Sequence, residues 1–313
     1  MKTGLFSHHD CLAHAPPAGH PESPDRLEAV LAALAAPAFE NLLRQEAPRA
    51  ERAALLAAHD EAHVDAILGS LNDDAQKNGF AVIDADTFMS PGSSEAALRA
   101  AGAVIAAVDR IADKTMKNAF CAVRPPGHHA PADRAMGFCL FNNVAVGAFH
   151  ARKTRLFERI AVIDFDVHHG NGTEDIFWND PNLYYASTHQ MPLYPGTGAP
   201  SERGVAQNIL NVPLTPYAGS DAFRSAMSNA ILPAVQSFAP DFIFISAGFD
   251  AHKSDPLAQL ELTENDFGWA TARICELAAK ACAGRVVSTL EGGYDLEALG
   301  RSAAAHVSAL MEA

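Results

Sequence analysis

Asp164-Phe165-Asp166-Val167-His168-His169 follows the apolar run at residues 160–163 and leads into Gly170-Asn171-Gly172. Successive side chains of a β-strand point to opposite faces, so an extended chain would place Asp164, Asp166 and His168 on one face. Two carboxylates and an imidazole beside a glycine-rich loop are ligands that divalent metal ions take in proteins. The stretch therefore predicts a metal site at the carboxyl end of a buried strand.

Three other apolar runs also end in polar clusters. These clusters are Arg124-Pro125-Pro126-Gly127-His128-His129, Ser246-Ala247-Gly248-Phe249-Asp250 and Glu291-Gly292-Gly293-Tyr294. If the strands before them are parallel, their carboxyl ends meet at one edge of the sheet, where open α/β sheets bind ligands. The four clusters are therefore expected to form one site.

Strand-like and helix-like segments alternate along the whole chain. The expected strands are residues 3–7, 119–123, 160–163, 183–187, 208–212, 242–245 and 285–290. The expected helices are residues 24–34, 51–68, 94–111, 142–152, 221–238 and 264–281, with one more closing the chain. Strands separated by helices of this length predict βαβ units, hence an α/β fold with a mainly parallel sheet covered on both faces. No composition shift marks a boundary, so residues 1–313 are expected to form a single catalytic domain.

Composition narrows the class of protein. The net charge of −14 gives no electrostatic support for nucleic-acid binding. No apolar run reaches membrane-spanning length, and the first residues carry no secretory signal. The five cysteines form no C-x-x-C pair, which is typical of buried, reduced thiols. We expect a cytoplasmic protein without a membrane or nucleic-acid partner.

Three residues are candidate metal ligands. Asp166 and His168 come from one strand end, and Asp250 comes from another. Three protein ligands leave a position open for water and substrate, as in catalytic zinc sites. The same oxygen and nitrogen donors also suit Fe(II). Any one of these residues alone would be interpreted as a capping aspartate or a surface histidine. All three together at strand ends favour a metal site.

A pair of histidines and a tyrosine are candidates for catalysis. His128 and His129 follow a rigid Pro-Pro-Gly turn and suit proton transfer to and from a water and a leaving amine. Each histidine needs an orienting partner, for which Asp164 and Asn171 are suitable. Tyr294 follows two glycines and could donate to a developing oxyanion, although a packed aromatic side chain is an equal reading of that turn.

Together these motifs, with Gly137-Phe138-Cys139 and Ser246-Ala-Gly-Phe-Asp-Ala-His252, resemble the histone deacetylase and acetylpolyamine amidohydrolase superfamily. The details are similar to class II deacetylases and their bacterial homologues. The resemblance implies a three-layer α/β/α fold of the arginase and deacetylase type and hydrolysis of an N-acyl amide at zinc. It implies that His129 is the general base and acid, that His128 is its electrostatic partner, and that Tyr294 polarises the carbonyl.

The resemblance also implies substrate and ion contacts. Gly137, Phe138 and Tyr194 would wall an acyl-lysine tunnel, Asp86 would hold the substrate backbone, and Arg26 would line a channel for the acid product. A structural potassium ion is implied mostly at backbone carbonyls of Asp164, Asp166, His168, Ser187 and Thr188. A second would use Phe177, Asp180 and Leu183.

The substrate class rests on one loop residue. Polyamine-specific members carry an acidic gatekeeper after the last metal ligand, and the corresponding residue here is Leu257. An apolar gatekeeper favours an acyl-lysine peptide or protein, or a related acylated amine. An acetylpolyamine amidohydrolase and a non-catalytic acyl-lysine-binding protein remain alternatives, whereas an arginase-like enzyme would need further ligands for a second metal. A bacterial host is expected, and a homodimer or homotetramer is compatible with the resemblance.

Overall fold

The computed structural model describes all 313 residues and is built on one parallel eight-stranded sheet. The strand order is β2-β1-β5-β10-β9-β6-β7-β8. The strands are β1 (Gly4–Ser7), β2 (Leu43–Glu46), β5 (Ala119–Cys121), β6 (Ile160–Asp164), β7 (Leu183–Gln190), β8 (Ile209–Leu214), β9 (Phe242–Ala247) and β10 (Val286–Leu290). A separate antiparallel hairpin contains β3 (Ala81–Val82) and β4 (Phe88–Met89).

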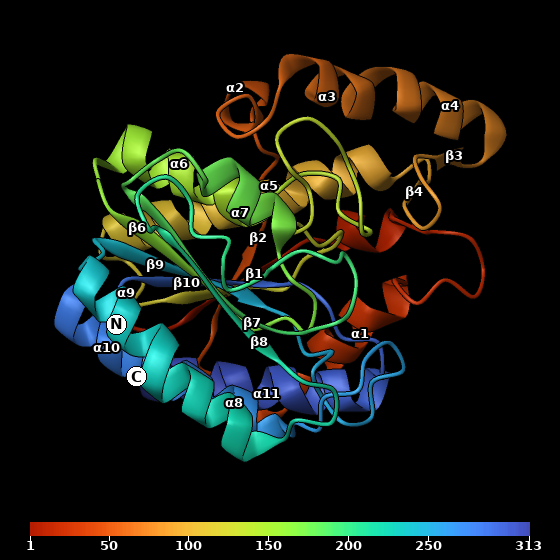
Figure 1. The fold of residues 1–313 in the computed structure, drawn as a ribbon. Helices are drawn as coiled ribbons and strands as arrows, with labels where there is room; N and C mark the ends of the chain where they lie inside the picture. Colours follow the sequence, from red (N-terminus) through yellow and green to blue (C-terminus); the bar gives the residue numbers. More distant parts are fainter.

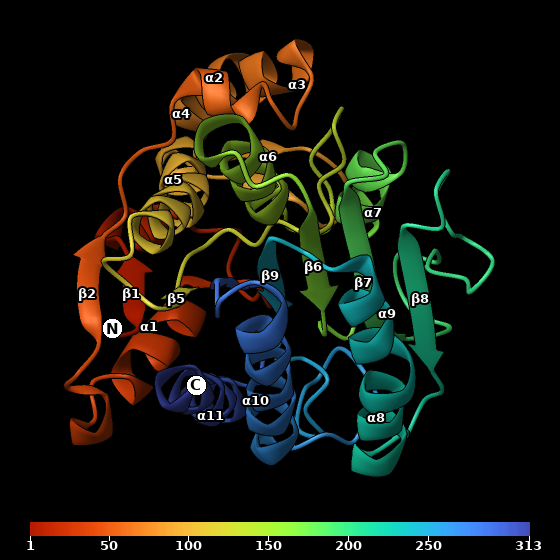
Figure 2. The same ribbon diagram turned by 90° about the vertical axis from the view of Figure 1, so that its left-hand side faces the viewer.

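Helices cover both faces of the sheet and form three layers (Figures 1 and 2). One layer contains α2 (Arg52–Leu55), α3 (Glu61–Asp65), α4 (Leu71–Asn78), α5 (Ser93–Ala112), α6 (Asn143–Arg155) and α7 (Asn171–Phe177). The other contains α1 (Pro24–Ala33), α8 (Ser220–Ala226), α9 (Leu232–Phe238), α10 (Glu264–Ala281) and α11 (Leu296–Glu312). Short 3-10 turns lie at His9–Ala13 and Pro37–Phe39, and π turns at Ala66–Ser70 and Met227–Ile231.

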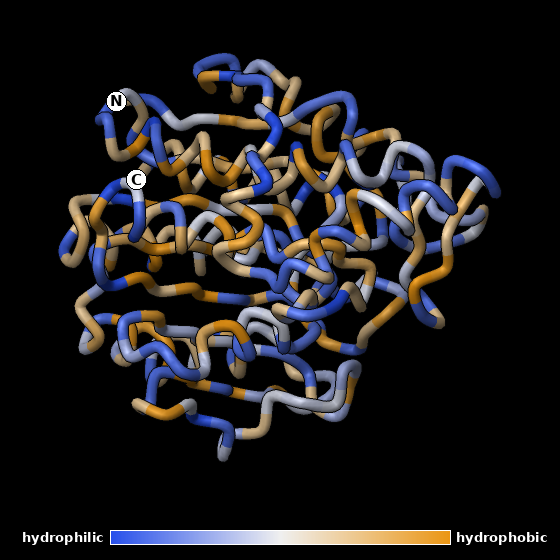
Figure 3. Tube along the Cα trace, turned by 90° about the horizontal axis from the view of Figure 1, so that it is seen from above, coloured by the Kyte–Doolittle hydropathy of each residue, from blue (hydrophilic) through white to orange (hydrophobic).

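The central strands are mostly apolar because both of their faces are covered. Every residue of β6, β9 and β10 is buried, as expected for parallel strands between two helical layers. Figure 3 shows long hydrophobic segments running through the middle of the molecule. None of the helices combines the length and apolar character needed to cross a bilayer. The predicted α/β class with a parallel sheet is confirmed.

The strand order explains how the polar clusters meet. The four clusters follow β5, β10, β9 and β6, which are consecutive neighbours in the sheet. Asp164 at the end of β6 pairs in register with Ser246 in β9. Since all four strands run in the same direction, their carboxyl ends open onto one edge.

Two local predictions were wrong. The single helix expected at residues 51–68 is divided, because His59 and Asp60 bind the backbone of a distant loop. The Asp60 amide donates to the Ala132 carbonyl at 2.8 Å, and the Asn142 amide donates to His59 Nε2 at 2.8 Å. Asp164, Asp166 and His168 were expected on one face of a strand, but β6 ends at Asp164 and the chain bends at residues 166–168.

Three buried histidines predict an acid-sensitive fold. Burial, assisted by neighbouring His63, lowers the pKa of His59 to about 4; burial lowers those of His189 and His306 to about 3. Unfolding lets each histidine bind a proton below about pH 6.5, so the contribution of these three groups to the free energy of unfolding falls as pH drops from 6.5 towards 4. Each group contributes at most about 1.4 kcal/mol per pH unit.

Guanidinium unfolding at pH 7.0 and 5.0 measures this effect. A His306→Gln variant is the matched control, because it removes one of the three groups and should reduce the difference between the two pH values. A change in unfolding free energy between the two pH values that is the same in the wild-type protein and in His306→Gln would contradict the argument.

Candidate active site

The three predicted metal ligands converge beyond the ends of β6 and β9. One ligand atom each from Asp166, His168 and Asp250 lies within 4.8 Å of the others, and all three residues are buried. His168 Nδ1 lies 3.0 Å from Asp250 Oδ2 and 3.2 Å from Asp166 Oδ1. The geometry therefore brings an imidazole nitrogen and two carboxylate oxygens to one point.

The surroundings of these three residues fit a divalent cation. The Val167 amide donates to Asp250 at 2.9 Å and the Gly292 amide donates to Asp166 at 2.8 Å, which fixes both carboxylates. A Cβ on Gly248 would lie 1.9 Å from Asp166 Oδ2, and one on Gly292 would lie 2.0 Å from Asp250 Oδ2. Only glycine allows this close approach. Neither carboxylate pairs with lysine or arginine, and the oxygen and nitrogen donor set suits zinc or Fe(II).

The histidine pair is held by two different partners. His128 Nδ1 lies 3.0 Å from Asp164 Oδ2, and His129 Nδ1 lies 2.9 Å from Asn171 Oδ1. Both partner atoms are acceptors, so each Nδ1 carries the proton and donates it. The rings lie 4.0 Å apart between centroids. Neutral His129 therefore keeps a free lone pair on Nε2.

The partners give the two histidines opposite charge states. Burial disfavours charge on His128, but the carboxylates of Asp166 and Asp164 outweigh it and raise the pKa of His128 to about 10. Burial, together with the charges of His128 and His168, holds the pKa of His129 well below 6.5. At neutral pH the pair consists of one cation and one neutral base.

A cavity of about 210 Å³ opens beside these groups. Its nine lining residues come from distant parts of the chain: Asp86, His129, Gly137, Phe138, His168, Leu193, Tyr194, Leu257 and Tyr294. The structure thus brings together every residue that the sequence suggested for substrate contact, and adds Leu193. Tyr194 stands edge-on to His129 at 5.1 Å, and Phe138 stands edge-on to Tyr294 at 6.0 Å between ring centroids. The cavity is narrow and largely aromatic.

Sequence reasoning missed the groups that hold these walls in place. Asp255 accepts from the Tyr294 amide at 2.7 Å and from the Leu257 amide at 3.0 Å, which joins two sides of the cavity. Burial, with the nearby charge of Asp250, raises the pKa of Asp255 to about 7. Tyr185 donates its hydroxyl to Asp164 at 3.0 Å. The only sequence feature that could have indicated this role of Asp255 is its position directly before a proline, in a loop with few glycines.

Other predicted residues lie close to the site without forming the cavity. Arg26 is fully buried, donates to the Gly293 carbonyl at 2.6 Å and places its guanidinium 4.8 Å from the Tyr294 ring centre. Ser187 and Thr188 are buried in β7, beside Asp164 at the end of β6. The potassium sites at these residues and at Phe177, Asp180 and Leu183 stay predictions.

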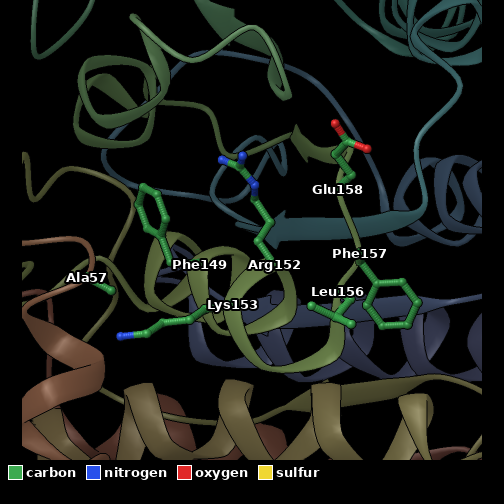
Figure 4. Close-up of a pocket in the computed structure, with 7 residues that line it drawn as sticks. All are labelled: Ala57, Phe149, Arg152, Lys153, Leu156, Phe157 and Glu158. Carbon is green, nitrogen blue, oxygen red and sulfur yellow. The ribbon is translucent and has the colours of Figure 1, made fainter.

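A larger cavity of about 470 Å³ lies on the outer surface beside α6. It is lined by Ala57, Phe149, Arg152, Lys153, Leu156, Phe157 and Glu158 (Figure 4). Figure 4 shows the charged end of Lys153 pointing to one side and those of Arg152 and Glu158 to another, so the three do not converge on one point. Binding sites carry polar groups that converge on a ligand, so this cavity is not the candidate site.

Comparisons with known proteins agree with this geometry. Residues 20–310 match the histone deacetylase domain family. A probable deacetylase of Archaeoglobus fulgidus is 39% identical over 95% of this chain and 82% of its own length. A histone deacetylase-like amidohydrolase of Pseudomonas aeruginosa is 38% identical over 94% of this chain and 82% of its own length. The crystal structure of the HDA15 HD domain superposes with a TM-score of 0.93 at 35% identity, covering 99% of this chain and 88% of that one.

The ligand cluster predicts that an Asp250→Ala variant binds zinc at least about 100-fold more weakly than the wild-type protein. Loss of residues that merely orient metal ligands already weakens binding 10–100-fold, and Asp250 supplies a ligand atom itself. Zinc content after dialysis, with competition against a chromophoric chelator, measures the change. Asp74→Ala removes an exposed aspartate and is the matched control. Unchanged zinc affinity in Asp250→Ala would place the metal elsewhere.

Proposed function

This chain belongs to the histone deacetylase family, and we propose that it is a zinc-dependent amidohydrolase that removes acetyl or other short acyl groups from lysine side chains or related linear amines. The observation that carries the proposal is the meeting of three kinds of group in one aromatic cavity. His129, His168 and Tyr294 line the cavity. Asp166 and Asp250 lie against His168, and His128 lies against His129. Each kind of group supplies a different part of amide hydrolysis.

The proposed mechanism uses the chain's own groups in turn. A zinc ion held by the ligand cluster would polarise the amide carbonyl and lower the pKa of a water. Neutral His129 takes the water proton on its free Nε2 and later gives a proton to the departing amine. His128, cationic through its contact with Asp164, stabilises the negative charge that develops beside it. Burial raises the pKa of Tyr294 well above 10, so its hydroxyl keeps a proton to donate to the oxyanion.

The cavity walls favour a neutral, extended acyl-lysine stem. Phe138, Tyr194, Leu193 and Leu257 offer apolar contact area, and an acylated ε-nitrogen carries no charge. Asp86 is the only carboxylate of the lining and would accept an N–H donor at the outer end. The alternative substrate, an acetylated polyamine, is favoured by that carboxylate and by the net charge of −14.

Several finer expectations accompany this proposal. We expect zinc as the resident metal, with Fe(II) an alternative, and potassium as a structural ion near Asp164. We also expect cytoplasmic location in a bacterial host, an acylated peptide, protein or small amine as the partner molecule, and no nucleic acid or membrane. The proposal leaves the oligomeric state open.

Amine release from an acetyl-lysine peptide and from an N-acetylated diamine tests the proposal directly. With zinc-loaded enzyme at matched substrate concentrations, we expect kcat/KM to be higher for the peptide, because Leu257 offers no charge to bind a free ammonium. Tyr294→Phe should lower kcat by about 10²–10³-fold, as removal of one oxyanion donor does elsewhere.

Preference for the diamine would replace the lysine proposal with polyamine deacetylation. Absence of turnover on both substrates, while an acetyl-lysine peptide still binds, would instead favour a non-catalytic acyl-lysine-binding protein. Binding of the peptide is therefore measured alongside turnover, by fluorescence anisotropy of a labelled acetyl-lysine peptide.

The acid limb of the kcat/KM profile should report His129. The base must be neutral, so activity is lost as pH falls through the pKa of His129, which lies below 6.5. Asn171→Asp places a carboxylate against His129 Nδ1 and should raise that pKa, which moves the acid limb to higher pH. An acid limb that Asn171→Asp does not move would exclude His129 as the titrating base.

A further inference from the structure

Glu291 places a fully buried carboxylate behind the candidate active site. Its Oε2 accepts from the Gly127 amide at 2.6 Å and from the His128 amide at 3.2 Å. Its Oε1 accepts from the Ser246 hydroxyl at 3.2 Å. The side chain does not line the cavity, and its three hydrogen bonds go to residues outside the ligand cluster.

The same residue is fixed by its backbone and by its chain neighbours. The Glu291 carbonyl accepts from Arg26 Nη2 at 2.5 Å, and the following amide of Gly292 donates to Asp166 at 2.8 Å. Three residues after Glu291 the chain reaches Tyr294. Glu291 therefore lies where the turn carrying the tyrosine meets the turn carrying both histidines.

Hydrogen bonds, and not a lysine or arginine side chain, compensate the burial of the Glu291 carboxylate. Glu291 pairs with no lysine or arginine side chain, and burial raises its pKa to about 7 against the opposing charge of His128. Taking a carboxylate out of water costs several kcal/mol unless hydrogen bonds compensate it. Three hydrogen bonds, from two backbone amides and one hydroxyl, supply that compensation, and two of them come from the turn that carries His128.

We propose that Glu291 is a positioning residue that sets the spacing between the His128–His129 pair and Tyr294 by binding the backbone of one turn from the base of the other. The inference rests on the proposed amide hydrolysis, in which His129 and Tyr294 act on the same amide group, His129 on the attacking water and the departing nitrogen and Tyr294 on the carbonyl oxygen. Productive geometry tolerates little displacement: a misplacement of about 1 Å can lower the rate about 10²-fold.

Glu291→Ala and Glu291→Gln distinguish the effect of the hydrogen bonds to the histidine turn from the effect of the negative charge. Alanine leaves the amides of Gly127 and His128 without their acceptor. Glutamine can keep both bonds through its carbonyl oxygen while its NH2 group donates to the Ser246 hydroxyl oxygen. Ser246→Ala is the matched control, because it removes the third hydrogen bond and leaves the two bonds to the histidine turn.

The expected result is a loss of kcat of about 10²-fold in Glu291→Ala with KM within about twofold of wild type. The cavity walls do not contact Glu291, so substrate binding should be retained, as should zinc content and the affinity for an acyl-chain hydroxamate probe. Glu291→Gln and Ser246→Ala should both retain kcat within about tenfold. Hydrogen exchange of the amides in residues 124–130 should accelerate in Glu291→Ala alone.

Three outcomes would overturn the proposal. Wild-type kcat in Glu291→Ala would show that the tie is dispensable. Loss of zinc or of hydroxamate binding in proportion to kcat would make Glu291 a folding residue. Equal inactivity of the alanine and glutamine variants would make charge, rather than position, the cause.

Failure of the proposed amide hydrolysis can be distinguished from failure of the positioning role of Glu291. In that case the wild-type enzyme releases no amine from any acyl amide, and the catalytic role of Glu291 is overturned with it. Protection of residues 124–130 that is lost in Glu291→Ala and kept in Glu291→Gln would then establish the tie between the two turns alone.

Discussion

Four carboxylates lie fully buried around the carboxyl ends of β5, β10, β9 and β6: Asp164, Asp166, Asp250 and Glu291. Burying a charge without compensation costs several kcal/mol per group, so most features of the site serve to compensate these four carboxylates. Backbone amides of the turns point at the carboxylates, glycines let them approach, and two histidines lie beside them. A divalent cation at the ligand cluster would complete the compensation.

This constraint also separates two chemically identical side chains. His128 and His129 are neighbours in one turn, yet one contacts the carboxylate of Asp164 and the other the amide of Asn171. The carboxylate favours a cation, and the amide leaves a neutral base with its Nδ1–H oriented. When the environments of two groups shift their pKa values in opposite directions, one site can hold an acid and a base at the same pH. The difference lies in partners that are 36 and 42 residues away in the chain.

The sequence predicted most of the fold because the decisive signals are local. Apolar runs mark the inner strands, and α10 occupies the predicted range 264–281. Contacts between distant segments account for the failures. The helix expected at 51–68 is interrupted where His59 forms hydrogen bonds with the backbone of residues 131 and 142. Nothing in the sequence around residue 59 indicates these distant partners. The polar clusters at strand ends could be predicted from the sequence. The hydrogen bond from the Gly127 amide to Glu291 joins residues 164 positions apart, and it follows only from the strand order.

Substrate choice depends on local groups more than on the charge of the whole chain. A net charge of −14 attracts cations, but exposed charges are screened beyond about 8 Å at physiological salt. Inside the cavity the only carboxylate is Asp86, and burial, with the neighbouring charge of Asp84, raises the pKa of Asp86. Phe138 and Leu257 offer a charged stem no compensation. Under the proposed function, an acylated lysine would bring a neutral stem to these walls and a backbone N–H to Asp86, which would satisfy both parts of the cavity at once.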